Sequence, residues 1–127
     1  MSLIVGAYPA QPAGSQQEFY RELTTVQAMR GLELPYGPNG GNPWPAGASG
    51  GWSAVVTSIP GTMQRMNASA AFGLASPDAG GRREALEFVA GLHAYVLSLK
   101  GEGRHVEAVE LHRRRIPAPM RPCSGHR

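Results

Sequence analysis

Short apolar runs alternate along the chain with longer segments that have helical periodicity. Four such runs predict strands, at residues 3–8, 31–35, 52–58 and 105–112. The first run ends at Pro9, which is typical of a strand that stops at a turn. In the second run, Leu32 and Leu34 are expected on one face and Glu33 on the other, because side chains alternate along a strand.

Two of the intervening segments have the periodicity of amphipathic helices. Phe19, Leu23 and Val26 recur at i, i+4 and i+7, which predicts a helix over residues 16–30. A longer helix is expected over residues 78–100, with one wide apolar face formed by Ala85, Phe88, Val89, Leu92, Tyr95, Val96 and Leu99. A short helix is expected over residues 62–69.

The segment from Gly37 to Gly51 consists almost entirely of Gly, Pro, Asn, Ala and Ser. This composition predicts a long loop or a degenerate crossover, in which Trp44 fills a gap in the packing. We recognise no two-residue hairpin turn in the sequence, so the strands are expected to be parallel and joined by right-handed crossovers.

Strands and helices repeat with a period of about 30 residues, as in a (β/α)₈ barrel of about 250 residues. The predicted fold class is therefore α/β, as the N-terminal half of a TIM barrel with four parallel strands and crossover helices. A doubly wound sheet fits the same elements, but no GxGxxG motif follows the first strand.

Charge divides the 127 residues into two parts. Residues 1–112 hold seven Lys or Arg and nine Asp or Glu, a net charge of −2, whereas residues 113–127 hold five Arg and no acid. We expect a partial barrel domain over 1–112 and a basic, Pro-rich, disordered tail over 113–127. The tail is either an anchor for an anionic partner or the product of a shifted frame or a premature end. The second interpretation is favoured, because the family pattern in the sequence stops at His112.

Composition excludes several function classes. The body has no basic run with interleaved aromatic residues, which argues against nucleic-acid binding by that part. The single Cys123 excludes an internal disulfide and a cysteine-based zinc site. The N-terminus lacks a basic segment and the chain lacks an apolar stretch of about 18 residues. We expect a soluble, cytoplasmic protein that does not enter a membrane.

The segments GLELP, AVVTSIPGTM, FGLASPD and AVELH resemble an uncharacterised family within the xylose isomerase-like TIM barrels. That superfamily includes sugar isomerases, epimerases and a DNA-repair endonuclease, and the resemblance covers about residues 3–112. It implies a divalent metal ion (Mn, Mg, Co or Zn), held by carboxylates and histidines at the C-terminal ends of strands. It also implies a small sugar-like substrate above the metal.

Three residues are candidates for the chemistry. Glu110 and His112 are two apart on a predicted strand, so both point to one face and form part of a metal site. The resemblance puts Glu110 where the superfamily has a catalytic or metal-binding glutamate. Glu33 is the second catalytic candidate. The alternatives are that Glu110 and His112 are solvated or structurally paired, and that Glu33 is paired with an arginine.

Thr57, Ser58 and Thr62 follow the third strand and are predicted to offer hydroxyl groups to a sugar at the rim. The alternative is that these small polar residues close the turn.

The sequence thus predicts the front half of a metal-dependent sugar (phosphate) isomerase or epimerase-like barrel, inactive as this fragment. The alternative is a noncatalytic, truncated or frameshifted fragment that self-associates through the open edges of its first and fourth strands.

Overall fold

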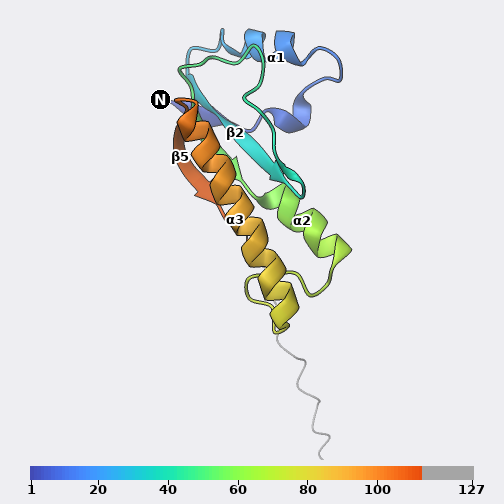
Figure 1. The fold of residues 1–127 in the computed structure, drawn as a ribbon. Coiled ribbons are helices and arrows are strands. Elements are labelled where there is room, and N and C mark those ends of the chain that lie inside the picture. Colours follow the sequence, from blue (N-terminus) through green and yellow to red (C-terminus); the bar gives the residue numbers. More distant parts are fainter. Residues whose placement is uncertain (113–127) are drawn as a thin grey trace, which may run out of the picture.

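Four parallel strands form a sheet in the order β1-β2-β4-β5, which is their order along the chain (Figure 1). The computed structural model describes residues 1–112; the predicted tail at 113–127, with Cys123, lies outside the described residues. The parallel strands are β1 (Leu3–Val5), β2 (Met29–Gly37), β4 (Ser53–Thr57) and β5 (His105–Glu110). The helices are the 3-10 helix η1 (Tyr8–Ala10) and the α-helices α1 (Gln16–Leu23), α2 (Ile59–Ala68) and α3 (Ala79–Gly101). The expected α/β architecture with parallel strands in sequential order is confirmed.

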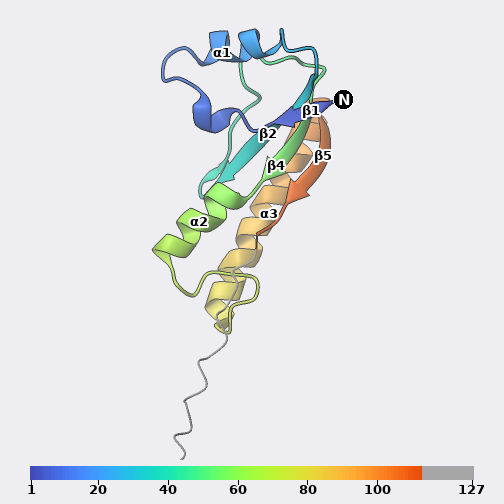
Figure 2. The ribbon, with the colours of Figure 1, turned by 180° about the vertical axis from the view of Figure 1, so that it is seen from behind.

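The long helix α3 crosses one face of the sheet, and no described helix lies across the opposite face (Figure 2). The Asp78 side chain caps α3 by accepting a hydrogen bond of 2.7 Å from the Gly81 N–H. The buried residues of α3 include five of the predicted apolar face: Ala85, Phe88, Leu92, Val96 and Leu99. Each large apolar side chain buried in this way contributes about 1.5–3 kcal/mol before entropy is counted.

The sheet supplies the other half of the core. Leu32 and Leu34 of β2 lie beside Ala54 and Val56 of β4, and all four side chains are almost completely buried. Glu33 lies between the two leucines on the opposite face, as the alternating pattern predicted. The hydrophobic face of β2 is therefore the face that lies toward α3.

Helix α1 is shorter than predicted. It ends at Leu23 instead of residue 30, and β2 already begins at Met29. The hydroxyl groups of Thr24 and Thr25 donate hydrogen bonds back to the carbonyl oxygens of Arg21 and Glu22, at 2.6 and 2.7 Å. β-Branched residues whose hydroxyls bond to the nearby backbone favour the end of a helix over its continuation. The apolar spacing, which continues to Val26, gave no indication of this end.

The prediction that hairpin turns are absent is wrong. β3 (Gly40–Gly41) pairs antiparallel with the end of β2, and Pro38 and Asn39 form the two-residue turn. Gly40 has a φ of 123°, a conformation that other residues rarely adopt, so the turn depends on the glycine that follows Pro-Asn. The rest of this loop continues to β4.

Trp44 packs against the core as expected, and the Arg104 guanidinium lies 4.6 Å from the centre of its ring. The loop is also held to α3, because the Tyr95 hydroxyl donates a 2.7 Å hydrogen bond to the Asn42 carbonyl. The segment that composition predicted to be loop is therefore tied down at two places.

The third strand leads into α2 earlier than predicted. The helix begins at Ile59 instead of residue 62, since Pro60 is tolerated in the first turn, where its missing N–H has no helical partner. Gly61 allows close packing: a Cβ there would lie 2.6 Å from the Phe88 ring and 2.6 Å from the Tyr36 carbonyl oxygen. Of the helices that the structure describes, none is long and apolar enough to cross a membrane.

Candidate functional site

Two predicted site residues, Glu33 and Glu110, lie on the sheet face opposite α3. Glu33 is in register with Val55 of β4, and Glu110 is in register with Thr57, two residues further along β4. Because alternate residues of a strand share a face, both carboxylates project from the same side of the sheet. Glu110 also ends β5, so it lies at the C-terminal edge of the parallel strands.

The chain leaves the sheet beside Glu33. The last residue of β1 is Val5, which pairs with Leu32, and Gly6 follows it. A Cβ on Gly6 would lie 3.5 Å from the Glu33 carboxylate atoms. The glycine therefore leaves the carboxylate less covered than any larger residue would.

The two carboxylates share one electrostatic environment with Tyr8. Partial burial, and then the negative charge of Glu110, raises the pKa of the Glu33 carboxyl. Burial, and then the charges of Glu33 and Glu110, raises the pKa of the Tyr8 phenol. Within residues 1–112, Glu33 forms no ion pair, so the arginine partner proposed as an alternative is not seen there.

His112 lies close to Glu110, as its spacing predicted. Its Nε2 is 4.0 Å from the Glu110 Oε2, and both side chains are about half exposed. The backbone N–H of His112 donates a 3.3 Å hydrogen bond to the Ser58 hydroxyl, which holds the end of β5 against the end of β4. The predicted metal-binding role of Glu110 and His112 stays a prediction.

The donor types of this pair suit a divalent metal ion, since carboxylate oxygens and imidazole nitrogens are its usual ligands. However, no group of three or more His, Cys, Asp or Glu side chains able to hold a metal is found among the described residues. The part of the chain that the structure describes thus offers an incomplete ligand set.

The three hydroxyl residues predicted to bind substrate are buried. Thr57, Ser58 and Thr62 are 0, 1 and 5% exposed. The Thr57 hydroxyl accepts a 3.3 Å hydrogen bond from the Ile59 N–H, and the Thr62 N–H donates to the Ser58 carbonyl at 2.9 Å. These contacts are the turn-closing ones of the alternative interpretation. Substrate binding by these residues stays a prediction.

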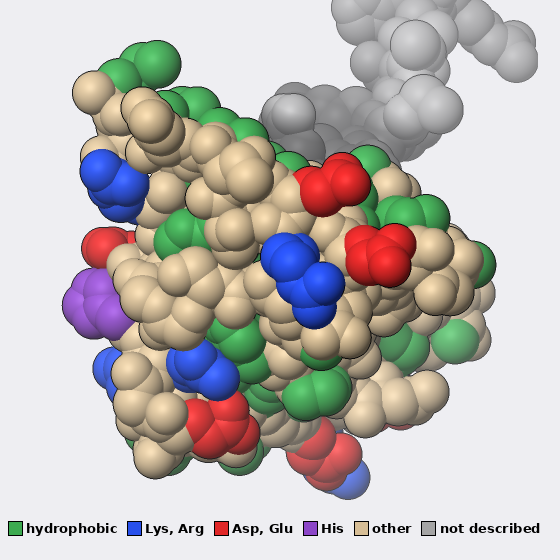
Figure 3. Space-filling view, turned by 90° about the horizontal axis from the view of Figure 1, so that it is seen from above, with side chains coloured by type: hydrophobic (Ala, Val, Ile, Leu, Met, Phe, Trp, Pro, Cys, Tyr) green, Lys and Arg blue, Asp and Glu red, His purple; other side chains and the backbone are tan. Residues whose placement is uncertain are grey.

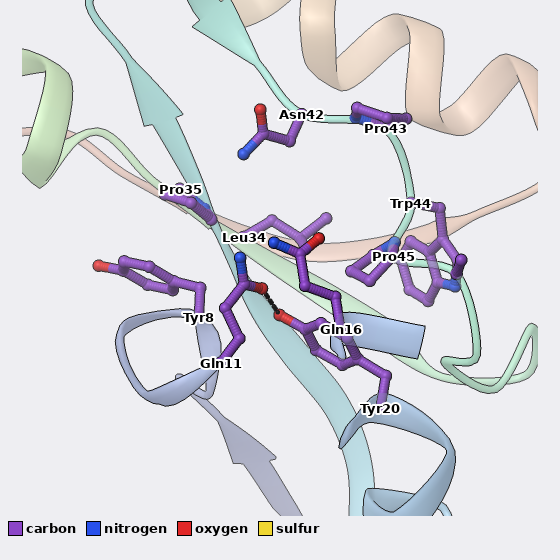
Figure 4. A pocket seen from close by; sticks show the side chains of 11 residues that line it. Tyr8, Gln11, Gln16, Tyr20, Leu34, Pro35, Asn42, Pro43, Trp44 and Pro45 are labelled. Atoms are coloured by element: carbon purple, nitrogen blue, oxygen red, sulfur yellow. Dashed lines mark hydrogen bonds between the residues drawn. The ribbon is translucent and has the colours of Figure 1, made fainter. Parts of the chain in front are cut away.

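A cavity of about 500 Å³ lies beside β2, with Leu34 and Pro35 in its wall (Figure 4). It opens beyond the end of β1, which pairs with β2 only as far as Leu32, whereas β2 continues to Gly37 and pairs with the short β3 at Tyr36 and Gly37. Its walls come from η1, α1, the end of β2 and the loop after β3. The lining residues are Tyr8, Gln11, Gln16, Tyr20, Leu34, Pro35, Asn42, Pro43, Trp44, Pro45 and Ala46.

Tyr20 and Gln11 hold two walls of this cavity together. The Tyr20 side chain of α1 is 3% exposed, and its hydroxyl donates a 2.8 Å hydrogen bond to the Gln11 Oε1. Tyr8 lines the cavity, and its pKa is raised by burial and then by the charges of Glu33 and Glu110. Tyr8 therefore links the lining of the cavity to the electrostatic environment of the two carboxylates.

Sequence reasoning missed the cavity because its residues come from segments that are separate along the chain and share no local pattern. In Figure 3, which looks down on the molecule from the top of Figure 1, basic and acidic side chains are interspersed and do not gather into one patch.

The sequence matches the family described as a domain of unknown function (DUF4862) over residues 4–121. The chain belongs to this family. It is also 35% identical, over 120 residues, to an uncharacterised protein of Salmonella typhimurium (strain LT2). That alignment covers 86% of this chain and 39% of the relative, so the chain spans about two fifths of the relative's length. No solved structure matches the chain.

The match extends to residue 121, beyond His112. The expectation that the family pattern stops at His112 is therefore wrong, and the shifted-frame interpretation of residues 113–127 loses the observation on which it depended. Neither match names an activity, so the resemblance to xylose isomerase-like barrels stays an expectation.

Proposed function

We propose that this chain supplies Glu33 and Glu110 as a carboxylate pair at the rim of a TIM-barrel-like enzyme that isomerises or epimerises a small sugar. The observation that carries the proposal is the placement of both carboxylates on one face of the sheet, on either side of β4, where burial, and then the Glu110 charge, raises the pKa of Glu33. The sequential parallel order of the strands and the face without a helix agree with part of a barrel, whose interior would hold such groups.

The chemistry of this class needs a group that removes a proton from the carbon next to a carbonyl and then returns it. Removal leaves the electron pair in an ene-diolate. Return of the proton to the neighbouring carbon, while the hydroxyl proton passes to the former carbonyl oxygen, isomerises the sugar; delivery of a proton to the opposite face of the same carbon, by a second acid, epimerises it. A carboxyl with a raised pKa is suited to both steps, since proton transfer is efficient when the pKa approaches the working pH. We assign this role to Glu33.

Glu110 and Tyr8 act on Glu33 and on the substrate. The Glu110 charge disfavours the ionised form of Glu33 and so strengthens it as a base. Tyr8, whose phenol pKa is raised, stays protonated at neutral pH and is a hydrogen-bond donor for a substrate oxygen.

A divalent ion of Mn, Mg, Co or Zn would stabilise negative charge on the substrate oxygens, with Glu110 and His112 among its ligands. Since the described residues do not bring three ligands together, no step above depends on the ion. The chain spans 39% of its relative, and we propose that it does not turn over sugar by itself.

The experiment that tests this function is solvent-deuterium incorporation into a ketose by the full-length Salmonella relative. We expect deuterium at the carbon next to the carbonyl. Glutamine at the position aligned with Glu33 should abolish incorporation, and glutamine at the position aligned with Glu107 should not. Glu107 is a suitable control because it lies on β5 but bonds to the Ser53 hydroxyl at 3.0 Å, away from the pair. Absence of incorporation with every ketose and aldose tested would refute the proposal.

A second candidate, noncatalytic self-association, has an observation of its own. Apolar side chains are exposed along both outer strands, with Leu3 and Ile4 on β1 and Val109 and Leu111 at the end of β5, all about 39–53% exposed. Outer strands with unpaired backbone groups invite pairing with another chain. Sedimentation velocity should show association that Val109→Lys weakens and that Leu97→Lys, on the exposed side of α3, leaves unchanged. A monomer at all concentrations would contradict it.

A further inference from the structure

We propose that the cavity between η1, α1 and the loop after β3 binds an uncharged sugar or polyol, and that it excludes sugar phosphates. This inference rests on the proposed function and narrows its substrate class, which the sequence left open between sugars and sugar phosphates. It is carried by the lining of the cavity, by the charges beside it and by the helix that begins at it.

The polar groups of the lining suit sugar hydroxyls. Gln11, Gln16 and Asn42 each carry an amide with two N–H donors and a carbonyl acceptor. A hydroxyl group both donates and accepts, so side-chain amides can satisfy both of its requirements. Figure 4 shows the amide ends of Gln11 and Gln16 turned into the space between β2 and the 42–45 segment.

The remaining walls suit the C–H faces of a sugar ring. Tyr8, Tyr20, Trp44 and three prolines supply apolar and aromatic surface around the amides. Such a mixture of apolar surface and convergent polar groups is typical of pockets for small molecules. The Tyr20–Gln11 hydrogen bond fixes one amide before a ligand arrives, which reduces the cost of ordering it on binding.

The charges near the cavity disfavour a phosphate. None of the lining residues is charged, and burial, then the charges of Glu33 and Glu110, raises the pKa of Tyr8 in its wall. A phosphate monoester carries a charge of about −1.5 to −2 and needs arginine, lysine or backbone N–H partners. Arg104, which lies over the Trp44 ring, does not line the cavity.

Among the described residues that line the cavity, the N-terminus of α1 is the feature that favours an anion, because Gln16 begins that helix. Its first turn already contains Glu18, whose carboxylate complements the helix dipole. A phosphate there would meet a negative side chain in addition to the carboxylate pair.

A second hollow provides a contrast. It lies between the β2–β3 turn, α2 and α3, and charged side chains line it, namely Arg65, Glu84 and Glu87. The neutral lining of the first cavity is therefore a property of that cavity and does not apply to every hollow in the molecule.

The test compares D-fructose with D-fructose 6-phosphate, using amide chemical shifts of the full 127-residue chain. We expect fructose to shift the signals of cavity residues and to bind about tenfold more tightly than the phosphate, since the lining leaves the phosphate unpaired. Gln16→Ala should weaken fructose binding about five- to tenfold. Gln17→Ala is the matched control, because Gln17 is the next residue of the same exposed helix turn and does not line the cavity.

A variant that is expected to gain affinity for the phosphate provides the second part of the test. Gln16→Lys places an ammonium group at the cavity and should shift the preference toward fructose 6-phosphate. Tighter binding of the phosphate to the unaltered chain, an equal loss in Gln16→Ala and Gln17→Ala, or no cavity shift with fructose would each overturn the inference.

These outcomes are separable from failure of the proposed function. If the cavity binds fructose but the full-length relative incorporates no deuterium into any sugar, the isomerase proposal fails and the binding assignment stands. If incorporation depends on the aligned Glu33 position while this cavity prefers the phosphate, only the present inference fails.

Discussion

The two faces of the sheet differ in what their residues do. On the face toward α3, Leu32, Leu34, Ala54 and Val56 are at most 3% exposed and pack into one core. On the other face, Glu33 lies in the middle of β2 and Glu110 ends β5, and burial, then the Glu110 charge, raises the pKa of Glu33. Stability comes chiefly from the first face and candidate chemistry from the second.

This difference teaches how one alternating sequence can serve two purposes. Successive residues of β2 point to opposite faces, so the carboxylate of Glu33 does not displace the buried side chains of Leu32 and Leu34 from the core. Substitutions on the covered face should therefore change stability, and substitutions on the open face should change titration and binding. The predictions below test that division, beginning with the largest effect.

Leu92→Ala should have the largest effect on stability, because Leu92 is 2% exposed in the core under α3. Removing its buried atoms leaves a cavity and should lower the free energy of unfolding by about 2–5 kcal/mol. Leu97→Ala is the control on the same helix, where the side chain is 54% exposed, and should change stability by less than about 0.5 kcal/mol. Urea denaturation measures both; similar losses would contradict the assignment of the covered face.

Gly81→Ala should also destabilise the fold. Gly81 lies in the first turn of α3, and a Cβ there would collide with the backbone carbonyl of Ala71. We expect a loss of about 1–3 kcal/mol from this overpacking. Gly101→Ala, at the other end of α3 where a Cβ meets open space, should instead gain up to about 1 kcal/mol. Thermal unfolding of both variants compares them, and a tolerated Gly81→Ala would rule out the close contact.

Tyr95→Phe should cost about 0.5–1.5 kcal/mol, because it removes the hydrogen bond to the Asn42 carbonyl. Burial, and then the charge of Glu102, raises the pKa of Tyr95 to about 12. The folded state therefore disfavours the tyrosinate, and its stability falls as pH rises above the ordinary value of 10. The difference between wild type and Tyr95→Phe should shrink or reverse over that range. Ultraviolet titration with denaturation at pH 9 and 11 provides the check, and a Tyr95 signal that titrates near pH 10 would contradict it.

Glu33→Gln should have the smallest effect on stability. The pKa of Glu33 is raised in the folded state, so ionising this carboxyl weakens the fold as pH rises through the ordinary value of 4.5. The variant lacks this effect and should be slightly more stable than wild type at pH 7. Below the ordinary pKa the advantage should disappear. Urea denaturation at pH 4 and pH 7 measures the difference in free energy of unfolding between the variant and wild type. If the variant loses stability relative to wild type between pH 4 and pH 7, the ionised carboxylate stabilises the fold and the prediction is wrong.

The covered face could be predicted from sequence because its signals are periodic. The apolar spacing of α3, the Asp78 start and the alternation of β2 each indicate one structure and agree with one another. The end of α1 was misplaced because Val26 continues the helical spacing although Thr24 and Thr25 end the helix, and Val26 is 45% exposed.

The open face was predictable only in part. The same-face placement of Glu110 and His112 follows from a spacing of two, and the structure brings them to 4.0 Å. The coupling of Glu33 to Glu110 depends on strand order and register, which no local pattern contains. The cavity depends on where β1 stops relative to β2, and the β2–β3 hairpin depends on Pro-Asn followed by a glycine with positive φ.

The most direct test of the carboxylate pair is a carbon-13 titration of the Glu33 carboxyl in wild type, Glu110→Gln and Glu107→Gln. Removing the Glu110 charge should lower the pKa of Glu33. Burial, the larger cause of the upward shift, should still keep this pKa above its ordinary value. Glu107→Gln should leave the Glu33 titration where it is in wild type. An unchanged pKa of Glu33 in Glu110→Gln would contradict the coupling on which the proposed function depends.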